Sequence, residues 1–413
     1  MKRLLSYTVF SLAFAGMHAQ LTTAQLSGQL NTITTAVPFL LISPDSRAGG
    51  MGDAGVASSP DANSMHWNAA KYGLIEKKMG MGISYTPWLR ALVPDINLAY
   101  VSFFAKPTKM GTFATSLRYF SLGNITFTDA VGNNIGQFNP NEFSLDMAYA
   151  QKLSDNFSGA FAFRYIHSNL TLGQNVGGEA SHAGNSIAAD VSMFYQNDKI
   201  EVSGKHATLG LGLNISNMGA KISYTSSGTK DFIPINMRLG GSLGIELDDY
   251  NSINFVLDIN KLMVPTLPVY KIDPVTGSPA KDPVTGEYIV EYGSNPNVSV
   301  VQGMFQSFGD APGGFKEEIK EYILAGGMEY WYGKPKIFAF RMGYFNEAAT
   351  KGNRKYLTFG IGVKYNVFGL DVAYLVPIVQ RNPLQNTLRF TLLFDFGGSK
   401  KDGDSTESST PKD

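Results

Sequence analysis

The chain has 413 residues, and its 34 lysines and arginines balance its 34 aspartates and glutamates, so its formal net charge is zero. A nucleic-acid-binding protein needs an excess of basic residues, so this balance argues against that class of partner. Charged residues make up only 16% of the chain, against roughly 25% in ordinary soluble domains, while glycine occurs 44 times. The absence of cysteine excludes disulfides, thiolate metal sites and a cysteine nucleophile.

The N-terminus has the pattern of a secretory signal peptide. Lys2 and Arg3 precede an apolar stretch from Leu4 to Ala15, and small and polar residues follow through Gln20. This order of basic, apolar and small residues is typical of export signals, and the apolar run is shorter than the roughly 20 residues that a spanning helix needs. We therefore expect residues 1–19 to be a signal peptide.

From about residue 77 onward, apolar side chains alternate with small or polar ones, which indicates β-strands with two unlike faces. Strands of about 9 to 11 residues can cross a bilayer, where an open sheet edge would leave backbone groups unpaired. The sequence therefore predicts an all-β fold, a closed fourteen-stranded antiparallel transmembrane β-barrel over residues 77–397. The predicted strands are 79–85, 95–105, 110–120, 143–149, 157–167, 187–195, 207–217, 235–246, 253–259, 320–331, 336–345, 357–365, 367–376 and 388–396.

The connections between these strands alternate in length. Outer-membrane barrels pair short periplasmic turns with long extracellular loops. We therefore expect an outer-membrane location in a Gram-negative cell, with both barrel ends periplasmic and the long loops extracellular. The short connections are 106–109, 152–156, 247–250, 332–336 and the turn at Asn366, with a longer one at 196–206; the long ones are 87–95, 121–141, 168–185, 217–234, 261–319, 346–355 and 377–387.

Residues 20–76 do not alternate and are rich in small side chains. Because fourteen strands enclose more space than wall side chains fill, we expect this segment to fold inside the barrel as a plug. Its charges would then need partners on lumen-facing strand positions. The predicted plug motif is Asp45, Arg47, Gly49, Gly50, Gly52, Asp53, Asp61, Asn63, Trp67 and Asn68, and the predicted partners of its four charged residues are Arg118, Asp146, Arg164, Asp190, Asp258 and Arg341.

The longest loop, 261–319, contains the pentapeptide Asp-Pro-Val-Thr-Gly twice, at 273–277 and 282–286. Proline in second position and glycine at the end are typical of tight turns, so we expect this loop to carry its own hairpin. Residues 315–322 have the charge density of a short surface helix. Residues 398–413 are polar and are expected to form a disordered periplasmic tail.

Apolar side chains in long loops are candidates for contact with partner proteins, because large apolar patches that face water usually mark binding sites. The alternative interpretation is structural: an aromatic girdle residue in the first loop, and a cap over the barrel mouth in the fifth. The candidate contact residues are Trp88, Leu89, Leu92 and Val93 in the first long loop and Met304, Phe305 and Phe308 in the fifth.

No catalytic, cofactor or metal site is expected. The histidines of the mature chain lie in separate segments, and neither a Gly-x-Ser-x-Gly motif nor a phosphate-binding loop is present. A surface hydrolase built on His167 and Ser168 is the remaining enzymatic alternative, although neighbouring residues of a strand point to opposite faces.

A barrel preceded by a small-residue segment that ends near Asn-Pro-Ala resembles the FadL family of long-chain fatty-acid channels, which have fourteen strands and an N-terminal plug. Here the triplet is Asn68-Ala69-Ala70. A closer resemblance, to the PorV (LptO) family of FadL-like proteins in the type IX secretion system of Bacteroidetes, extends over residues 38–72. It lies in the string Ser43-Pro-Asp-Ser-Arg-Ala-Gly-Gly-Met-Gly-Asp-Ala-Gly-Val-Ala-Ser-Ser-Pro-Asp-Ala-Asn-Ser-Met-His-Trp-Asn68.

This resemblance implies a protein-export function without chemistry of its own. PorV-like proteins are understood to bind cargo at the translocon by its C-terminal signal domain and to deliver it to a surface attachment complex. The implied partners are the secretion translocon barrel, the C-terminal signal domains of cargo, a sortase-like attachment complex and outer-membrane lipid. A FadL-like channel for hydrophobic small molecules is the alternative that the barrel pattern alone does not separate from this function.

Overall fold

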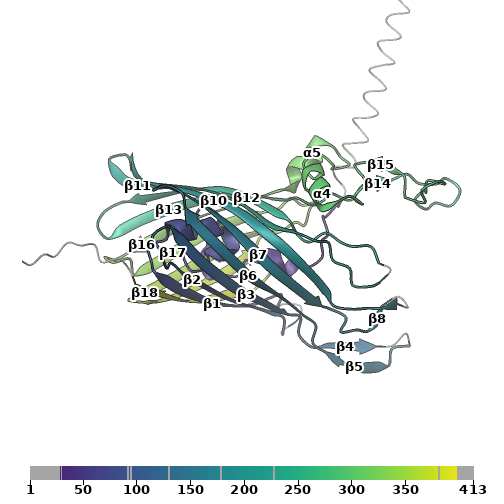
Figure 1. The fold of residues 1–413 in the computed structure, drawn as a ribbon, viewed down its shortest axis with the longest axis horizontal. Helices are drawn as coiled ribbons and strands as arrows, with labels where there is room; N and C mark the ends of the chain where they lie inside the picture. The colour runs from purple at the N-terminus through teal and green to yellow at the C-terminus, as the bar shows by residue number, and fades with distance from the viewer. Residues whose placement is uncertain are drawn as a thin grey trace, which may run out of the picture.

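The computed structural model describes residues 28, 30–90, 93, 95–128, 131–176, 179–226, 228–379 and 382–397, so the predicted signal peptide and C-terminal tail lie outside the described residues. Fourteen antiparallel strands close into one barrel, which confirms the predicted fold class (Figure 1). Each predicted strand overlaps one strand of the wall. In order around the barrel these are β1 (Met79–Pro87), β2 (Asn97–Ala105), β3 (Gly111–Ser121), β6 (Asn141–Lys152), β7 (Phe157–Asn169), β10 (Gly184–Val202), β11 (Lys205–Gly219), β12 (Asn236–Glu246), β13 (Asn251–Leu262), β16 (Tyr322–Tyr332), β17 (Phe338–Asn346), β18 (Lys355–Tyr365), β19 (Phe368–Pro377) and β20 (Thr387–Phe396).

Side chains on the wall strands alternate between the outer surface and the lumen. On β18, Phe359 and Ile361 are 43% and 54% exposed on the outside, whereas Thr358, which faces the lumen, is 1% exposed. Period-two alternation places successive side chains on opposite faces, so one face of each strand is apolar and the other is small or polar. The outer surface of the barrel is therefore apolar, as a bilayer requires.

The long and short connections lie at opposite ends of the barrel, which we call the long-loop end and the short-turn end (Figure 1). The expectation of a longer connection at 196–206 is wrong. Strands β10 and β11 continue through it and turn at Ser203 and Gly204, whose φ angles of 51° and 72° suit a two-residue hairpin. This hairpin extends beyond its neighbours at the short-turn end.

Within the described residues, three of the long loops carry strands or helices of their own. Strands β4 (Ile125–Thr128) and β5 (Asn134–Phe138) form one small hairpin, and β8 (Asn175–Val176) and β9 (Glu179–Ala180) form another. The fifth long loop contains the pair β14 (Val269–Tyr270) and β15 (Val290–Tyr292), the helices α4 (Val300–Gln306) and α5 (Phe315–Glu318), and the 3₁₀ turn η3 (Ile319–Glu321).

The duplicated pentapeptides form two similar turns within the β14–β15 hairpin, which confirms the hairpin prediction. Asp273 Oδ1 accepts a hydrogen bond from the Val275 amide at 2.8 Å, and Asp282 Oδ1 accepts one from the Val284 amide at 2.7 Å. The predicted helix near 315–322 is present as α5 and η3. Its acidic side chains are buried, however, rather than on the surface.

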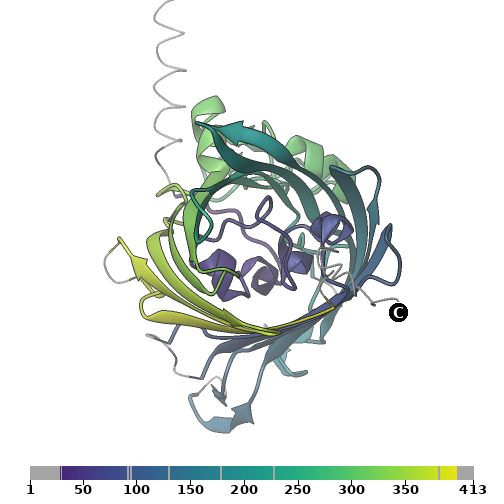
Figure 2. The same ribbon diagram turned by 90° about the vertical axis from the view of Figure 1, so that its left-hand side faces the viewer.

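Residues 36–75 lie inside the barrel, where Figure 2 shows their short helices enclosed by the ring of strands. These are η1 (Pro38–Leu41), α2 (Ser46–Gly49), α3 (Ser64–Trp67) and η2 (Ala69–Leu74), and we call residues 36–75 the interior segment. Apolar contacts hold it against the wall; for example, the ring of Tyr72 stacks on that of Phe104 at 5.3 Å. In the described part of the chain, no helix combines the length and the apolar character needed to cross a membrane.

Candidate functional site: the lumen and the long-loop mouth

The interior segment is organised by its own polar side chains. Asp45 caps α2, because its Oδ2 accepts a hydrogen bond from the Ala48 amide at 2.9 Å. Its other oxygen accepts one from the Trp67 indole nitrogen at 2.6 Å, which joins α2 to α3. Aspartate is a favoured N-cap residue because it satisfies an amide that lacks a partner within the helix. Asp45 and Trp67 of the predicted plug motif therefore hold the segment in shape.

Two ion pairs join the interior segment to the wall. Arg47 donates to Glu329 on β16, with Nη2 and Oε2 2.7 Å apart, and also pairs with Asp61 of the same segment at 2.8 Å. Arg389 on β20 pairs with Asp53. Buried charges are retained in proteins when they are paired, so these contacts compensate the charges that enter the lumen with the segment.

The predicted wall partners are therefore wrong as ion pairs, because Glu329 and Arg389 take that role. Asp258 contacts the interior segment through the amides of Gly55 and Val56, at 2.7 and 2.9 Å. Arg118 contacts it through the carbonyl oxygen of Leu40, at 2.6 Å. The other predicted partners pair within the wall: Arg164 with Asp146 and Asp190, and Arg341 with Glu329 and Asp371.

Glycines let the interior segment approach the wall backbone. Gly327 on β16 and Gly343 on β17 face each other in the sheet, and Met51 and Gly52 lie directly over them. A methyl group on Gly343 would overlap the backbone nitrogen of Gly52. Gly52 also has a φ of 74°, a conformation that glycine adopts without strain, and its amide donates to Thr358 Oγ1 at 2.8 Å. The Gly-rich motif thus matches a side-chain-free area of the wall.

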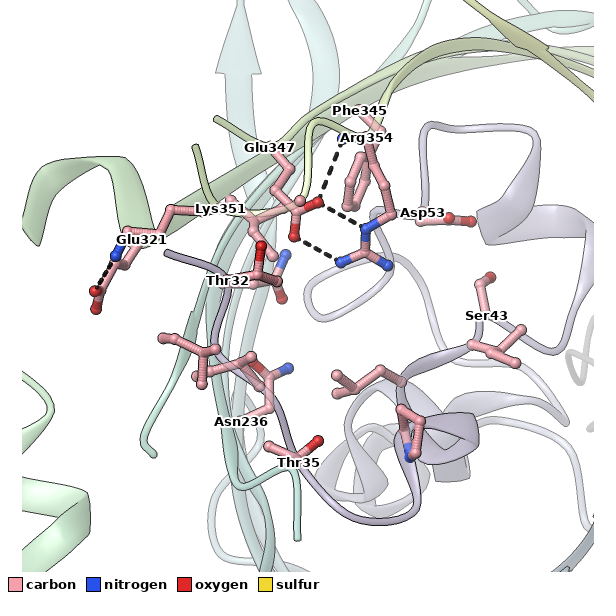
Figure 3. A pocket seen from close by; sticks show the side chains of 18 of the residues that line it. Thr32, Thr35, Ser43, Asp53, Asn236, Glu321, Phe345, Glu347, Lys351 and Arg354 are labelled. Carbon is pink, nitrogen blue, oxygen red and sulfur yellow. Dashed lines mark hydrogen bonds and ion pairs between the residues drawn. The ribbon is translucent and has the colours of Figure 1, made fainter. Parts of the chain in front are cut away.

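A cavity of about 420 Å³ lies at the long-loop end, between the start of the interior segment and the wall (Figure 3). Most of its lining is apolar and comes from residues distant in sequence, including Ile33, Leu41, Ile42, Trp88, Phe345 and Leu384. Charged side chains line one side of it. We call this cavity the mouth cavity.

The charged side of the mouth cavity centres on an arginine and a glutamate from the loop between β17 and β18. Arg354 donates two hydrogen bonds to Glu347, each at 2.8 Å, and its guanidinium lies 5.5 Å from the centre of the Phe345 ring (Figure 3). Burial disfavours the charged guanidinium, but the hydrogen bonds and the charge of Glu347 outweigh this and raise the pKa of Arg354. The opposite charges of Arg354 and Glu347 cancel, so the pair adds no net charge to that side of the cavity.

Of the first-loop candidates, Trp88 lines this cavity. Trp88 and Leu89 are half-buried and pack against apolar residues of the wall and, for Trp88, of the interior segment. Val93 is 37% exposed. Leu92 lies outside the described residues. The structure therefore brings Trp88 to the mouth cavity and leaves Val93 facing solvent.

The fifth-loop candidates all lie on or just after α4. Met304 is half-buried and packs against the apolar cluster that includes the start of the interior segment, whereas Phe305 is 72% exposed. Phe308 is 39% exposed, and the Lys261 ammonium lies 5.8 Å from the centre of its ring. Helix α4 thus presents one apolar side to the barrel mouth and Phe305 to solvent.

His167 and Ser168 on β7 point to opposite faces of the wall. The His167 ring nitrogen Nδ1 lies 2.9 Å from Asn185 Oδ1, whereas Ser168 donates to Glu142 at 2.7 Å inside the barrel. A hydrolase nucleophile needs its base within hydrogen-bond reach. These two residues do not form a nucleophile–base pair.

A closed barrel of fourteen strands with an apolar outer surface defines an integral β-barrel protein of the outer membrane. The family model described as "Type IX secretion system protein PorV" matches residues 25–269, more than half of the chain. The chain belongs to this family, and is thus an outer-membrane component of the type IX secretion system.

Solved structures with similarity to the chain include two toluene transporters and one FadL homologue. TodX of Pseudomonas putida is 10% identical, with 89% of this chain and 99% of that chain covered and a TM-score of 0.46. TbuX of Ralstonia pickettii is 12% identical, with 86% and 97% covered and a TM-score of 0.43. A FadL homologue of Pseudomonas aeruginosa is 11% identical, with 89% and 100% covered and a TM-score of 0.41. No curated protein matches the chain.

Proposed function

We propose that this protein is a cargo shuttle of the type IX secretion system. It binds secreted proteins by their C-terminal signal domain at the translocon barrel and delivers them to a surface attachment complex with a sortase-like protease. The observation that carries the proposal is the PorV family match over residues 25–269. The filled lumen supports it, because a shuttle needs a binding surface rather than an open passage.

The proposed orientation follows from the two unlike ends. The long-loop end faces the cell exterior, and the short-turn end, where β1 begins and β20 ends, faces the periplasm. Outer-membrane barrels have their longer loops outside, which supports this orientation. Residues 20–76 act as a plug, and the burial of Asp45, Arg47 and Lys71 in the lumen supports a stable closure.

Cargo contact is proposed for the exposed apolar residues at the long-loop end. Phe305, Phe308 and Val93 offer exposed area, while Met304, Trp88 and Leu89 are half-buried and pack against apolar clusters. Aromatic side chains that are exposed next to well-packed neighbours are frequent centres of binding energy. Helix α4 is therefore the first place to test.

A channel for hydrophobic small molecules is the second candidate function. The apolar lining of the mouth cavity supports it, since small apolar ligands bind in concave, mostly apolar sites. A channel would also need a path past the interior segment. Catalysis is not proposed, because His167 and Ser168 face opposite sides of the wall.

Co-purification from native envelopes tests the shuttle. We expect the affinity-tagged protein to recover both a large translocon barrel and secreted proteins with a C-terminal signal domain. Recovery of neither, together with saturable binding of a fatty acid or an aromatic hydrocarbon, would replace the shuttle with the channel.

The contact surface is tested by replacing Met304, Phe305 and Phe308 with serine. We expect cargo recovery to fall about tenfold, because residues at the centre of an interface carry most of its binding energy. Phe315→Ser is the matched control, since Phe315 is 77% exposed in the same loop but lies on α5. Unchanged recovery in the triple variant would remove these three residues from the site.

A further inference from the structure

A cluster of buried carboxylates lies where the fifth long loop returns to the barrel. Asp310, Glu318 and Glu321 each place a carboxylate oxygen within 4.8 Å of those of the other two. Asp310 lies between α4 and α5, Glu318 ends α5, and Glu321 ends η3. Their exposed fractions are only 1%, 5% and 5%. Acidic residues are seldom buried this deeply without positive partners.

The surrounding lysines compensate only part of this negative charge. Lys261 Nζ lies 2.8 Å from Glu318 and 2.7 Å from Glu321, and Lys351 Nζ lies 2.5 Å from Glu317 and 2.9 Å from Glu321. With Glu317 included, these four carboxylates and the two lysines that form ion pairs with them carry a formal charge of −2 (2 − 4). Burying uncompensated charge is costly, which favours an additional cation.

One carboxylate oxygen of Asp310 has no donor in the described part of the chain. Asp310 Oδ2 accepts a hydrogen bond from the Thr266 amide at 3.1 Å, but Asp310 Oδ1 is buried and finds no hydrogen-bond partner within the described parts of the chain. A buried oxygen left without a partner calls for an explanation, and a bound ion is one.

We propose that Asp310, Glu318 and Glu321 bind one Ca²⁺ ion at the base of the fifth long loop. Ca²⁺ prefers oxygen ligands at about 2.3–2.6 Å, so two of its ligands lie at most about 4.6–5.2 Å apart, and the three carboxylate oxygens lie within 4.8 Å of one another. Its double positive charge cancels the excess of −2. Mg²⁺ fits less well, because its ligands lie at about 2.0–2.1 Å in a strict octahedron.

The ion would strengthen the connection between the fifth loop and the wall. Lys261 belongs to β13 and already contacts Glu318 and Glu321, which belong to α5 and η3. Glu321 also lines the mouth cavity, which gives an ion access from the long-loop end. A calcium-loaded cluster would fix the base of the loop that carries α4.

Calcium titration of the purified full chain tests the site directly. After EDTA treatment and dialysis in detergent, we expect isothermal titration to show one saturable Ca²⁺ site, and the midpoint of thermal unfolding to rise with CaCl₂ more than with MgCl₂. Asp310→Asn should weaken Ca²⁺ binding at least about tenfold, because it removes a charged ligand. Glu291→Gln, an exposed acid of the same loop, should bind Ca²⁺ like the unchanged protein.

Two results would overturn the proposal. One is the absence of saturable Ca²⁺ binding to the unchanged protein up to on the order of 10 mM, beyond the range of weak extracellular sites. The other is equal binding by the unchanged protein and Asp310→Asn, which would assign the ion to bound lipopolysaccharide. If Asp310→Asn does not fold, Glu318→Gln replaces it, and the titration of the unchanged protein still decides.

Discussion

Arg47 and Glu329 form a two-point ion pair inside the barrel, with Nε and Oε1 2.9 Å apart and Nη2 and Oε2 2.7 Å apart. Arg47 belongs to the interior segment and Glu329 to β16, and they are 7% and 1% exposed. Arg341 on β17 also donates to Glu329 Oε1, at 2.8 Å. Glu329 therefore connects the interior segment to two neighbouring strands of the wall.

Removing Arg47 should destabilise the protein strongly. We expect Arg47→Ala to lower the free energy of unfolding by about 3–5 kcal/mol, because it leaves a buried carboxylate with one partner fewer. Guanidinium unfolding in detergent, followed by tryptophan fluorescence, measures this. Lys334→Ala is the control: its pair with Asp249 spans 3.0 Å, but the side chains are 60% and 76% exposed. That variant should change stability by less than about 1 kcal/mol. Equal effects of the two variants would contradict a holding role for Arg47.

A methyl group at Gly343 should displace the interior segment. Gly343→Ala places a carbon against the backbone of Gly52, which cannot retreat as a flexible side chain could. We expect a loss of about 1–3 kcal/mol from overpacking and a higher single-channel conductance in planar bilayers. Gly241→Ala on β12 is the matched control, because the nearest atom to its new carbon, Leu211 Cδ2, is 3.6 Å away. Conductance unchanged in both variants would count against the glycine contact as the element that keeps the segment in place.

Replacing Trp88 should lower the stability of the protein and should not weaken cargo binding directly. Trp88 is half-buried between two apolar clusters at the barrel mouth, so we expect Trp88→Ala to lower the free energy of unfolding by about 1–3 kcal/mol. Val93→Ala, at a residue that is 37% exposed, should change it by less than about 0.5 kcal/mol. Thermal unfolding measures both. Loss of cargo recovery in Trp88→Ala without loss of stability would make Trp88 a direct contact.

The wall of the barrel could be predicted from sequence because a bilayer imposes a strict pattern on it. Each strand must show lipid an apolar side chain at every second residue, and no edge can stay open. This is why the predicted segments 143–149 and 357–365 lie within β6 and β18. The exception, at residues 196–206, lies beyond that constraint: the polar residues there continue as strand because the two-residue turn at Ser203 and Gly204 holds them together.

The ion pairs of the lumen could not be assigned in the same way. Arg389 lies between the outward-facing Leu388 and Phe390, so its inward direction was readable from the alternation. The pairing of Arg389 with Asp53 could not be predicted, because it depends on how the strands are staggered around the barrel. Glu329 lies just after Gly326 and Gly327, where apolar and polar residues do not alternate clearly. The sequence therefore does not indicate that Glu329 faces the lumen.

For the carboxylates of the fifth loop, the sequence indicates an exposed position, whereas the structure buries them. Their spacing in sequence, at 317, 318 and 321, resembles the exposed face of a charged surface helix. Their burial becomes evident only in the structure, where Lys261 and Lys351 from distant parts of the chain form ion pairs with these acids. Contacts between segments about 30 to 60 residues apart follow from the closed sheet, not from local pattern.

The hairpin tip at Ser203 and Gly204 gives a practical way to determine sidedness. From Asn197 to Val202, β10 pairs with β11, while its other neighbour β7 begins level with Tyr195, so the tip stands clear of the rim. Exposed tips of this kind accept inserted peptides without harm to the fold. An epitope placed there and a second one at Gly277 would be reached by antibodies from opposite compartments, and whole cells would display only one of them.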